Sequence, residues 1–263
     1  MTDVVRRGRG KRIAKTVGWY VLLTLVAAVI VFPVYITFIN SVLSYEQILN
    51  AHLLPPNPFN PQVWSDAVDY FSRALNEGHM ARLLFNSFVM TVCIVIGQVA
   101  TGVLAGYAFA YLRFPFKRTL FVAFLATLMI PFEVTVVANL SFISNAGLYD
   151  TYAGLVLPFL ATGFAAFLMR QAFLALPRDL WEAAELDGYG HLRYLWKVAL
   201  PLVRPTVAAL TVFAALGAWG QYVWPKLVTS GRPNHDLRTV QIGVRELFAQ
   251  NITNFNIGYA GLV

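Results

Sequence analysis

The chain is poor in the residues that build disulfides, metal sites and phosphate-binding loops. It has one cysteine, Cys93, which lies inside an apolar run and cannot form an internal disulfide. Its four histidines are scattered over polar segments without metal-ligand spacing: His52, His79, His191 and His235. The pattern GxxxxGK(S/T) is absent, which argues against ATP binding through such a loop on this chain. We therefore expect no catalytic residue, no bound metal ion and no cofactor on the chain itself.

Charged side chains are also scarce. They make up 13% of the 263 residues, against 58% hydrophobic residues, and the mean hydropathy is +0.60. A soluble fold of this composition would have too little polar surface to cover itself. The apolar residues gather in runs of about 20, the length that crosses roughly 30 Å of hydrocarbon as a helix. The composition predicts an all-α, multi-pass protein of the lipid bilayer.

Apolar runs of this kind occur five times, at residues 17–38, 83–111, 120–140, 152–169 and 206–224. We expect five membrane spans within a single membrane domain, residues 17–263, that follows a flexible basic tail, residues 1–16. The polar segments 41–82 and 225–256 should be external loops, the first with a helix around residues 64–75. The chain ends on an apolar stretch where a sixth span would begin, and we expect that span to follow the last residue.

The distribution of cations predicts the orientation in the membrane. The net charge of +7 lies in the N-terminal tail and in loops beside the spans rather than on one soluble face, which argues against a nucleic-acid partner. With the N-terminus inside, fourteen lysines and arginines fall in the tail and the inner loops, and six fall in the outer segments. This asymmetry follows the positive-inside tendency. The N-terminus and the loop between the fourth and fifth spans should be cytoplasmic.

That loop, residues 177–205, is a charged interruption in an apolar protein. It holds four of the thirteen carboxylates and four cations. Pro177 suits the first turn of a helix, and Gly188 is well placed to end that helix in a left-handed conformation. A second helical segment, residues 191–200, should be stopped by Pro201. We predict a helix, a glycine bend and a second helix that meet a cytoplasmic partner.

The loop has three elements at fixed spacing: Glu182-Ala183-Ala184, Asp187-Gly188 and, thirteen residues after the glycine, Pro201. This pattern resembles the EAA loop of the permease subunits of ATP-binding-cassette importers, which have the type I importer fold. In that family the loop docks as a short coupling helix into a cleft on the ATPase subunit. The resemblance implies that these residues, with Arg193, couple the chain to an ATPase. The chain departs from the family in its bulky Tyr189 and His191, since a small residue is usual after the glycine.

Four further segments narrow the resemblance: MIPFEVTVVANL, GLYDTYAGLVLP, FLMRQAF and GQYVWP. They are similar to the carbohydrate-uptake permeases of the maltose-transporter kind, and most to those of the glycerol-3-phosphate importers, although asparagine is usual where this chain has Gly220. The resemblance implies a subunit of the bacterial cytoplasmic membrane that imports a sugar or a glycerol-phosphate-type substrate. It also implies a homologous second permease, two copies of an ATPase subunit that hold ATP and Mg, and an extracytoplasmic substrate-binding protein.

Six residues in or near the apolar runs are candidates for the substrate pathway: Glu133, Trp219, Gln221, Tyr222, Gln98 and Asn86. A carboxylate is costly in lipid, so Glu133 should face the pathway or a partner permease. Aromatic faces stack on sugars and amides bond their hydroxyls, which favours the cluster from Trp219 to Tyr222, with Trp224 as a lesser member. The alternatives are an interfacial aromatic belt for that cluster and helix-packing hydrogen bonds for Gln98 and Asn86.

Two other functions stay open. A transporter driven by an ion gradient would usually have more intramembrane acids, or broken helices in matching halves of the chain. A membrane-embedded hydrolase needs a nucleophile and a base at one depth, and no histidine lies in an apolar run. Uptake that depends on an ion gradient rather than on ATP would favour the first alternative, and failure of any ATPase to copurify would revive both.

Overall fold

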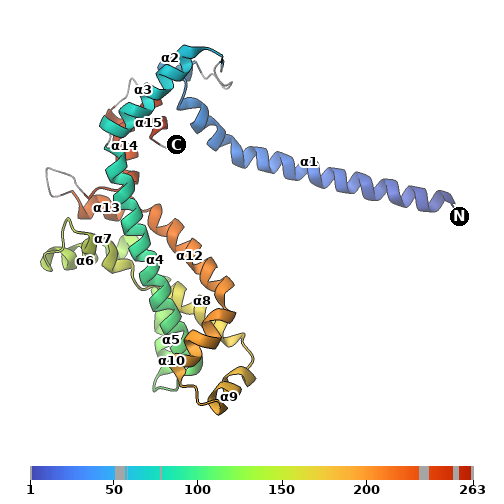
Figure 1. The fold of residues 1–263 in the computed structure, drawn as a ribbon, viewed down its shortest axis with the longest axis vertical. Helices are drawn as coiled ribbons and strands as arrows, with labels where there is room; N and C mark the ends of the chain where they lie inside the picture. Colours follow the sequence, from blue (N-terminus) through green and yellow to red (C-terminus); the bar gives the residue numbers. More distant parts are fainter. Residues whose placement is uncertain are drawn as a thin grey trace. The chain divides into compact units, whose positions relative to one another are not determined.

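The computed structural model describes residues 2–50, 57, 59–77, 79–230, 237–250 and 255–261. Among these residues the regular secondary structure is helical throughout, which confirms the predicted all-α class. The chain divides into two compact units, Met1–Met80 with Val244–Val263, and Ala81–Gly243 (Figure 1). The predicted coupling loop and the predicted pathway residues all belong to the second unit.

The first unit begins with one long helix, α1, Thr2–Asn40. The segment expected to be a flexible tail is helical from Thr2 onward, because arginine and lysine are good helix formers and no proline interrupts the segment. Every residue from Lys15 to Tyr35 is exposed within the chain, and the helix from Lys15 to Asn40 is long and apolar enough to cross a membrane. An uncovered apolar helix of this length requires lipid or another chain around it.

Four shorter helices complete the first unit: α2 Tyr45–Leu49, α3 Pro61–Glu77, the end of α14 Val240–Gln250, and α15 Phe255–Ala260. Ser44 starts α2 with a capping box, because its hydroxyl accepts from Gln47 N and the Gln47 side chain accepts from Ser44 N. Helix α15 packs against α1, α2 and α3. The helix predicted around residues 64–75 is confirmed as α3, while residues 51–56 of that predicted loop lie outside the described part.

The second unit is organised around α4, Met80–Tyr111, which confirms the second predicted span as a continuous helix. It meets α8, Gly163–Leu174, at glycines that let the two backbones come close. A Cβ atom on Gly102 would lie 2.8 Å from Ala165 Cβ, and one on Gly106 would lie 2.6 Å from Met169 Cβ. On its other sides α8 packs against α5, Lys117–Thr127, and α12, Arg204–Trp219.

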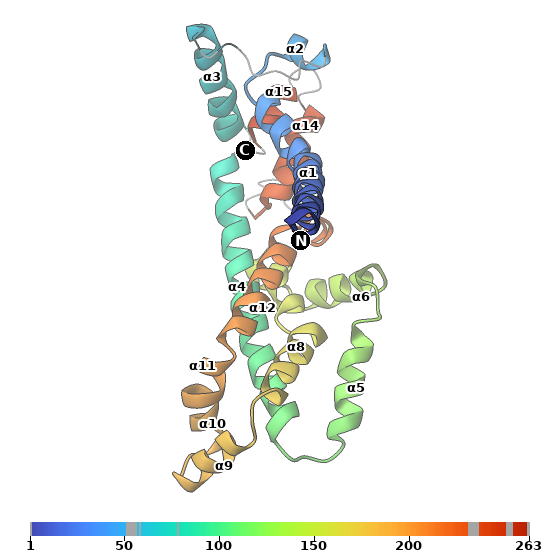
Figure 2. The same ribbon diagram turned by 90° about the vertical axis from the view of Figure 1, so that its right-hand side faces the viewer.

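Two predicted spans are bent rather than continuous. Helix α5 meets α6, Phe132–Asn145, at 99°, with the break just before the helix that Pro131 caps (Figure 2). The segment α7–η1, Tyr152–Val156 and Leu157–Phe159, meets α8 at 48°. Two described helices can cross a membrane by length and composition, or up to five if each bent pair counts as one span. The predicted number of five spans therefore stays a prediction.

The fifth predicted span also ends earlier than expected. Residues 206–224 were expected to form one helix, but α12 ends at Trp219 and Gly220 is its C-cap. The chain is not helical at Gln221 and Tyr222, and α13, Val223–Val228, follows. The physical reason is that glycine favours a helix end, and after the break Trp224 packs into the same buried cluster as Ala218, near the end of α12.

Candidate functional site

The predicted coupling loop forms a short helix, α9, Asp179–Leu186, at one end of the second unit (Figure 2). The carbonyl of Arg178, the N-cap residue, accepts from Trp181 N at 2.9 Å and from Glu182 N at 3.1 Å. The helix therefore begins at Asp179, and Pro177 lies two residues before it rather than in its first turn as predicted. Asp179 and Glu182 lie in the first turn, where the helix dipole favours negative charge. The carboxylates therefore stabilise this end of the loop.

The predicted glycine bend is confirmed. Gly188 has a φ of +76°, in the left-handed region that glycine adopts without steric strain. Gly188 N donates to Glu185 O at 3.0 Å and Tyr189 N donates to Ala184 O at 2.8 Å. These two bonds are those of a Schellman motif, which satisfies the last carbonyls of the helix and reverses the chain.

The predicted stop at Pro201 is wrong. The second segment begins at His191 as expected, with α10, His191–Tyr194, but continues through the π-helical turn η2, Leu195–Ala199, into α11, Leu200–Leu202. A proline lacks an N–H and its ring crowds the carbonyl four residues earlier, and a wider π turn relieves both problems. The chain instead bends at Val203, where the α10–α11 segment meets α12 at 81°.

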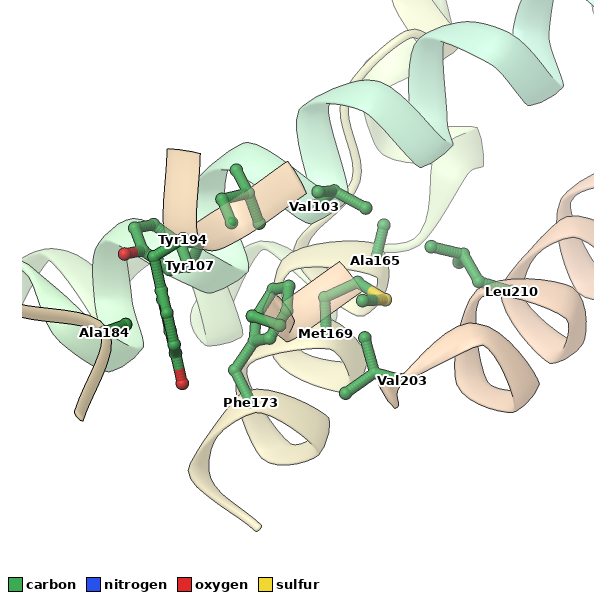
Figure 3. Packing of buried hydrophobic residues seen from close by; sticks show 11 residues of the cluster. Val103, Tyr107, Ala165, Met169, Phe173, Ala184, Tyr194, Val203 and Leu210 are labelled. Atoms are coloured by element: carbon green, nitrogen blue, oxygen red, sulfur yellow. The ribbon is translucent and has the colours of Figure 1, made fainter. Parts of the chain in front are cut away.

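The inner face of α9 packs into a cluster of buried side chains at the ends of α4 and α8. Ala184 is the buried residue of α9, with 6% of its surface exposed, and it shares this cluster with Tyr107, Phe173 and Tyr194. Figure 3 shows Ala184 at one edge of the cluster, beside the two tyrosines, and Leu210 at the opposite edge. The last alanine of the predicted Glu182-Ala183-Ala184 motif is thus a packing position, whereas Ala183 is exposed.

Helices α9, α10 and η2 carry large apolar side chains that nothing in the described chain covers. Leu186 is 90% exposed, Leu192 68% and Trp196 60%. Beside them, the predicted coupling residues Glu182, Ala183, Asp187 and Arg193 are also exposed. Exposed apolar groups rimmed by charge are typical of a surface that binds another protein.

Aromatic rings hold the two short helices together across the bend. The Trp181 and His191 rings are parallel, with centroids 4.5 Å apart and an interplanar angle of 2°. The His191 Nδ1 atom lies 3.0 Å from the Tyr107 hydroxyl of α4. The guanidinium of Arg193 lies over the Tyr189 ring at 4.2 Å. The two bulky residues that depart from the resembled family therefore both make specific contacts.

Two cations bind the C-terminal end of α4, a feature that the sequence analysis missed. Lys117 Nζ donates to Ala110 O at 3.2 Å and to Leu112 O at 2.9 Å, and Arg170 Nε donates to Phe109 O at 3.2 Å. Helix ends leave their last carbonyls without partners, and cations there also interact favourably with the dipole. A lysine soon after a predicted helix end is the sequence signal that could have indicated this cap.

The predicted pathway residues divide into two groups. Trp219, Gln221 and Tyr222 lie together at the break between α12 and α13. Trp219 is 38% exposed, and the buried Gln221 Oε1 has no hydrogen-bond partner in the described part of the chain. The Tyr222 hydroxyl accepts from Lys226 Nζ at 3.0 Å, which puts a cation beside this group. The break thus gathers an amide, two aromatic rings and an ammonium group.

The other predicted pathway residues lie apart from this break. Asn86 is 1% exposed, donates to Arg238 O at 3.0 Å and accepts from the Tyr152 hydroxyl at 2.6 Å. Gln98 Nε2 donates to Phe159 O at 2.9 Å. Both amides therefore join α4 to other elements, and a pathway role for either stays a prediction.

Glu133 and Trp224 have environments that differ from the expected ones. Glu133 was expected inside a continuous span, but it is exposed in the first turn of α6, after the 99° bend, where the helix dipole favours its charge. Trp224 is 1% exposed, donates to Gly154 O at 3.2 Å and packs edge-on against Phe132 and Phe159. Trp224 therefore joins α13 to α6 and to the α7–η1 segment.

The fold and the site together define a class, a helical membrane protein with bent spans and an exposed helix, bend and helix loop. The chain belongs to the family of binding-protein-dependent transport system inner membrane components, which residues 98–261 match, more than half of its length. Members of this family are permease subunits of ATP-driven importers, so the predicted family and the predicted permease function are confirmed. Membership implies a partner permease, an ATPase and a substrate-binding protein, and it supports an inner-membrane location.

Three relatives are each described as "sn-glycerol-3-phosphate transport system permease protein UgpE". The chain is 34% identical to that of Yersinia enterocolitica serotype O:8 over 236 residues, 88% of this chain and 82% of the relative. It is 36% identical to that of Rhizobium meliloti strain 1021 over 235 residues, 87% of this chain and 80% of the relative. For Agrobacterium fabrum the identity is 37% over 230 residues, with 87% and 80% covered.

The fold is also similar to that of a solved structure, a bacterial ABC transporter involved in the import of the acidic polysaccharide alginate. The TM-score is 0.78 at 22% sequence identity, and the match covers 96% of this chain and 90% of that chain. This similarity confirms the importer permease fold.

Proposed function

We propose that the chain imports glycerol 3-phosphate or a closely related phosphate ester, and that its α9 is the coupling helix to the ATPase. The chain would pair with a homologous permease, receive substrate from an extracytoplasmic binding protein and be driven by two ATPase copies. Its N-terminus and the loop at residues 177–205 would face the cytoplasm, where ATP is found. The substrate is suggested by the relatives described above, which are named as permeases for glycerol 3-phosphate.

The observation that carries the docking proposal is the two-sided character of α9. On one side Ala184 is fixed in the aromatic cluster, and on the other Leu186 is 90% exposed. Exposed apolar side chains such as Leu186, Leu192 and Trp196 are unfavourable in water and favourable in an apolar cleft of a partner. Glu182, Ala183, Asp187, Gly188 and Arg193 would form or shape this docking surface. Pro201 would act at a distance, through the π-helical turn that leads from the loop into α12.

A phosphate ester carries negative charge, so its pathway should offer a cation or hydrogen-bond donors. Lys226 supports the proposed substrate, because its ammonium group binds the Tyr222 hydroxyl beside Gln221 and Trp219. An ammonium group can attract the phosphate while the aromatic rings contact the glycerol carbons. Glu133, on the neighbouring α6, is proposed to border the same path.

The test is ATP hydrolysis by the purified assembly, reconstituted in lipid with its binding protein. Glycerol 3-phosphate, a glycerophosphodiester, a disaccharide and an amino sugar would be compared at equal concentration. We expect glycerol 3-phosphate to stimulate hydrolysis most and to be imported only when ATP is present. Stimulation by the disaccharide alone would contradict the proposed substrate but not the importer. Uptake driven by an ion gradient, in an assembly without any ATPase, would contradict the coupling role of α9.

A further inference from the structure

The contacts that hold α9 in place are few. It has eight residues, of which Ala184 alone is buried, and it is joined to α10 through a bend that contains Gly188 and Gly190. A Cβ atom on either glycine would meet nothing within 4 Å, so packing of the bend backbone does not fix the angle between the two helices. Side-chain contacts across the bend must therefore supply much of the orientation of α9.

One imidazole contacts both α9 and α4, in addition to the direct ring contacts of Trp181 with Tyr194 of α10 and Tyr111 of α4. His191 is the first residue of α10, and its ring stacks on Trp181 of α9 with centroids 4.5 Å apart and planes 2° from parallel. Its Nδ1 atom lies 3.0 Å from the hydroxyl of Tyr107, which belongs to α4. The Tyr107 ring in turn meets Phe173 of α8 edge-on, with centroids 5.7 Å apart. A continuous chain of contacts thus runs from α9 through His191 to α4 and α8.

The far end of this chain of contacts is anchored in the spans. Tyr107 is 4% exposed and Phe173 is 1% exposed, so neither ring can move without disturbing the cluster around it. The same end of α4 is bound by Lys117 of α5 and Arg170 of α8 through its last carbonyls. A displacement that reaches Tyr107 would therefore be shared among α4, α5 and α8.

We propose that His191 is the positioning residue that transmits movement of the coupling helix to α4. The Trp181 stack makes α9 and α10 turn as one body, and the hydrogen bond to Tyr107 ties that body to the end of the span. This inference rests on the proposed docking of the ATPase on α9. It also gives a reason for the bulky residue at position 191, one of the two departures from the resembled family.

Three substitutions test separately the two contacts of His191, the stack on Trp181 and the hydrogen bond to Tyr107, which together we call the joint. His191→Ala removes both the stack and the hydrogen bond, His191→Phe keeps a flat ring that can stack on Trp181, and Tyr107→Phe removes one oxygen atom from a buried ring. The matched control is Tyr111→Phe. It removes the same atom one helical turn away on α4, where the hydroxyl makes only longer and weaker contacts, 3.3 Å to the Tyr194 hydroxyl and 3.4 Å to Phe173 O, rather than the 3.0 Å contact with His191.

The measurement is the amount of substrate imported per ATP hydrolysed, in proteoliposomes with the binding protein, together with the amount of ATPase that copurifies. We expect every variant to retain the ATPase, because the exposed docking face is unchanged. Tyr107→Phe and His191→Phe should each lower the import per ATP about 3- to 10-fold, the range for one lost hydrogen bond. The double variant should be no worse than either single variant, because both remove the same bond. His191→Ala should lower the ratio further, and Tyr111→Phe should leave it within about twofold of the unmodified assembly.

Two results would overturn this inference. If His191→Ala and Tyr107→Phe import as much substrate per ATP as the unmodified assembly, the joint does not transmit movement. If His191→Phe or Tyr107→Phe releases the ATPase, these residues only shape the docking surface. Both results presuppose an unmodified assembly that contains the ATPase and couples its hydrolysis to import, and an assembly that lacks it would instead contradict the proposed function.

Discussion

Replacing Gly106 of α4 by alanine should destabilise the chain by about 1–3 kcal/mol, the range found for overpacked cores. The added Cβ atom would lie 2.6 Å from Met169 Cβ, 2.8 Å from Arg170 N and 2.9 Å from Met169 C. No side-chain rotation moves these atoms, so α4 and α8 would have to separate. Separation would also lengthen the 3.2 Å bond from Arg170 Nε to Phe109 O, which caps the end of α4.

Alanine at Gly102 or Gly97 of α4 should destabilise the chain by smaller amounts. Gly102→Ala should have a similar but smaller effect, because its Cβ would meet Ala165 Cβ at 2.8 Å while the nearest backbone atom is 3.2 Å away. Gly97→Ala should cost less, because its nearest contact is the flexible end of Leu160. Gly217→Ala in α12 is the control. Its Cβ would meet nothing within 4 Å, and alanine is the better helix former by about 1 kcal/mol, so this variant should be neutral or more stable.

The assay is thermal unfolding of the purified protein in one detergent. About 2–4 °C per kcal/mol is expected for a chain of this size, so Gly106→Ala should lower the midpoint by roughly 2–12 °C. Gly217→Ala should leave the midpoint unchanged or raise it. Equal midpoints for Gly106→Ala and Gly217→Ala would refute the reasoning, because they would mean that α4 and α8 do not need a glycine to approach.

Three further predictions concern the site. Gly188→Ala should cost about 1–2 kcal/mol of backbone strain without any clash, because the φ of Gly188 is +76° and an added Cβ would meet nothing within 4 Å. Substrate uptake should fall while the amount of permease in the membrane stays unchanged, and Gly188→Asn should retain more uptake than Gly188→Ala. Glu182→Lys should weaken copurification of the ATPase while the permease stays in the membrane, and full retention would place the docking surface elsewhere. Lys226→Ala should raise the glycerol 3-phosphate concentration that half-stimulates ATP hydrolysis, while Lys226→Arg should change it little; an equal rise with both would leave the charge without a role.

Features that are set by residues close together in the sequence could be predicted from the sequence. The Gly188 bend follows from glycine's tolerance of positive φ, and α4 follows from an apolar run without proline. The break between α5 and α6 could not be predicted in the same way, because the hydropathy of a run shows that it is apolar but not whether its helix is straight or bent. Pro131 indicated an irregularity, but the angle of 99° also reflects packing of Phe132 against Phe159 and Trp224, which lie far along the sequence.

The joint around His191 was hidden from the sequence for a related reason. Tyr107 is 84 residues away, and no short motif connects a tyrosine at the end of one span with a histidine in a later loop. Neither metal-ligand spacing nor position in an apolar run can indicate a histidine ring that stacks on another ring and makes a single hydrogen bond. The departure from the family pattern at Tyr189 and His191 was the available signal, because a bulky residue next to a required bend needs a partner.

The cap at the end of α4 leads to a last prediction. Lys117→Met should destabilise the second unit by about 1–2 kcal/mol, because it removes both bonds from Nζ, to Ala110 O and Leu112 O, while water can reach part of the site and replace them incompletely. Arg118→Met removes the neighbouring exposed cation and is the matched control. It should change the free energy of unfolding by less than about 0.5 kcal/mol. Lys117→Arg should restore most of the loss, since a guanidinium can donate to two carbonyls at once.

Because α4 ends where α5, α8 and the coupling loop meet, Lys117→Met should also lower import per ATP. An effect on stability without any effect on that ratio would mean that the cap holds α4 together but does not carry the movement.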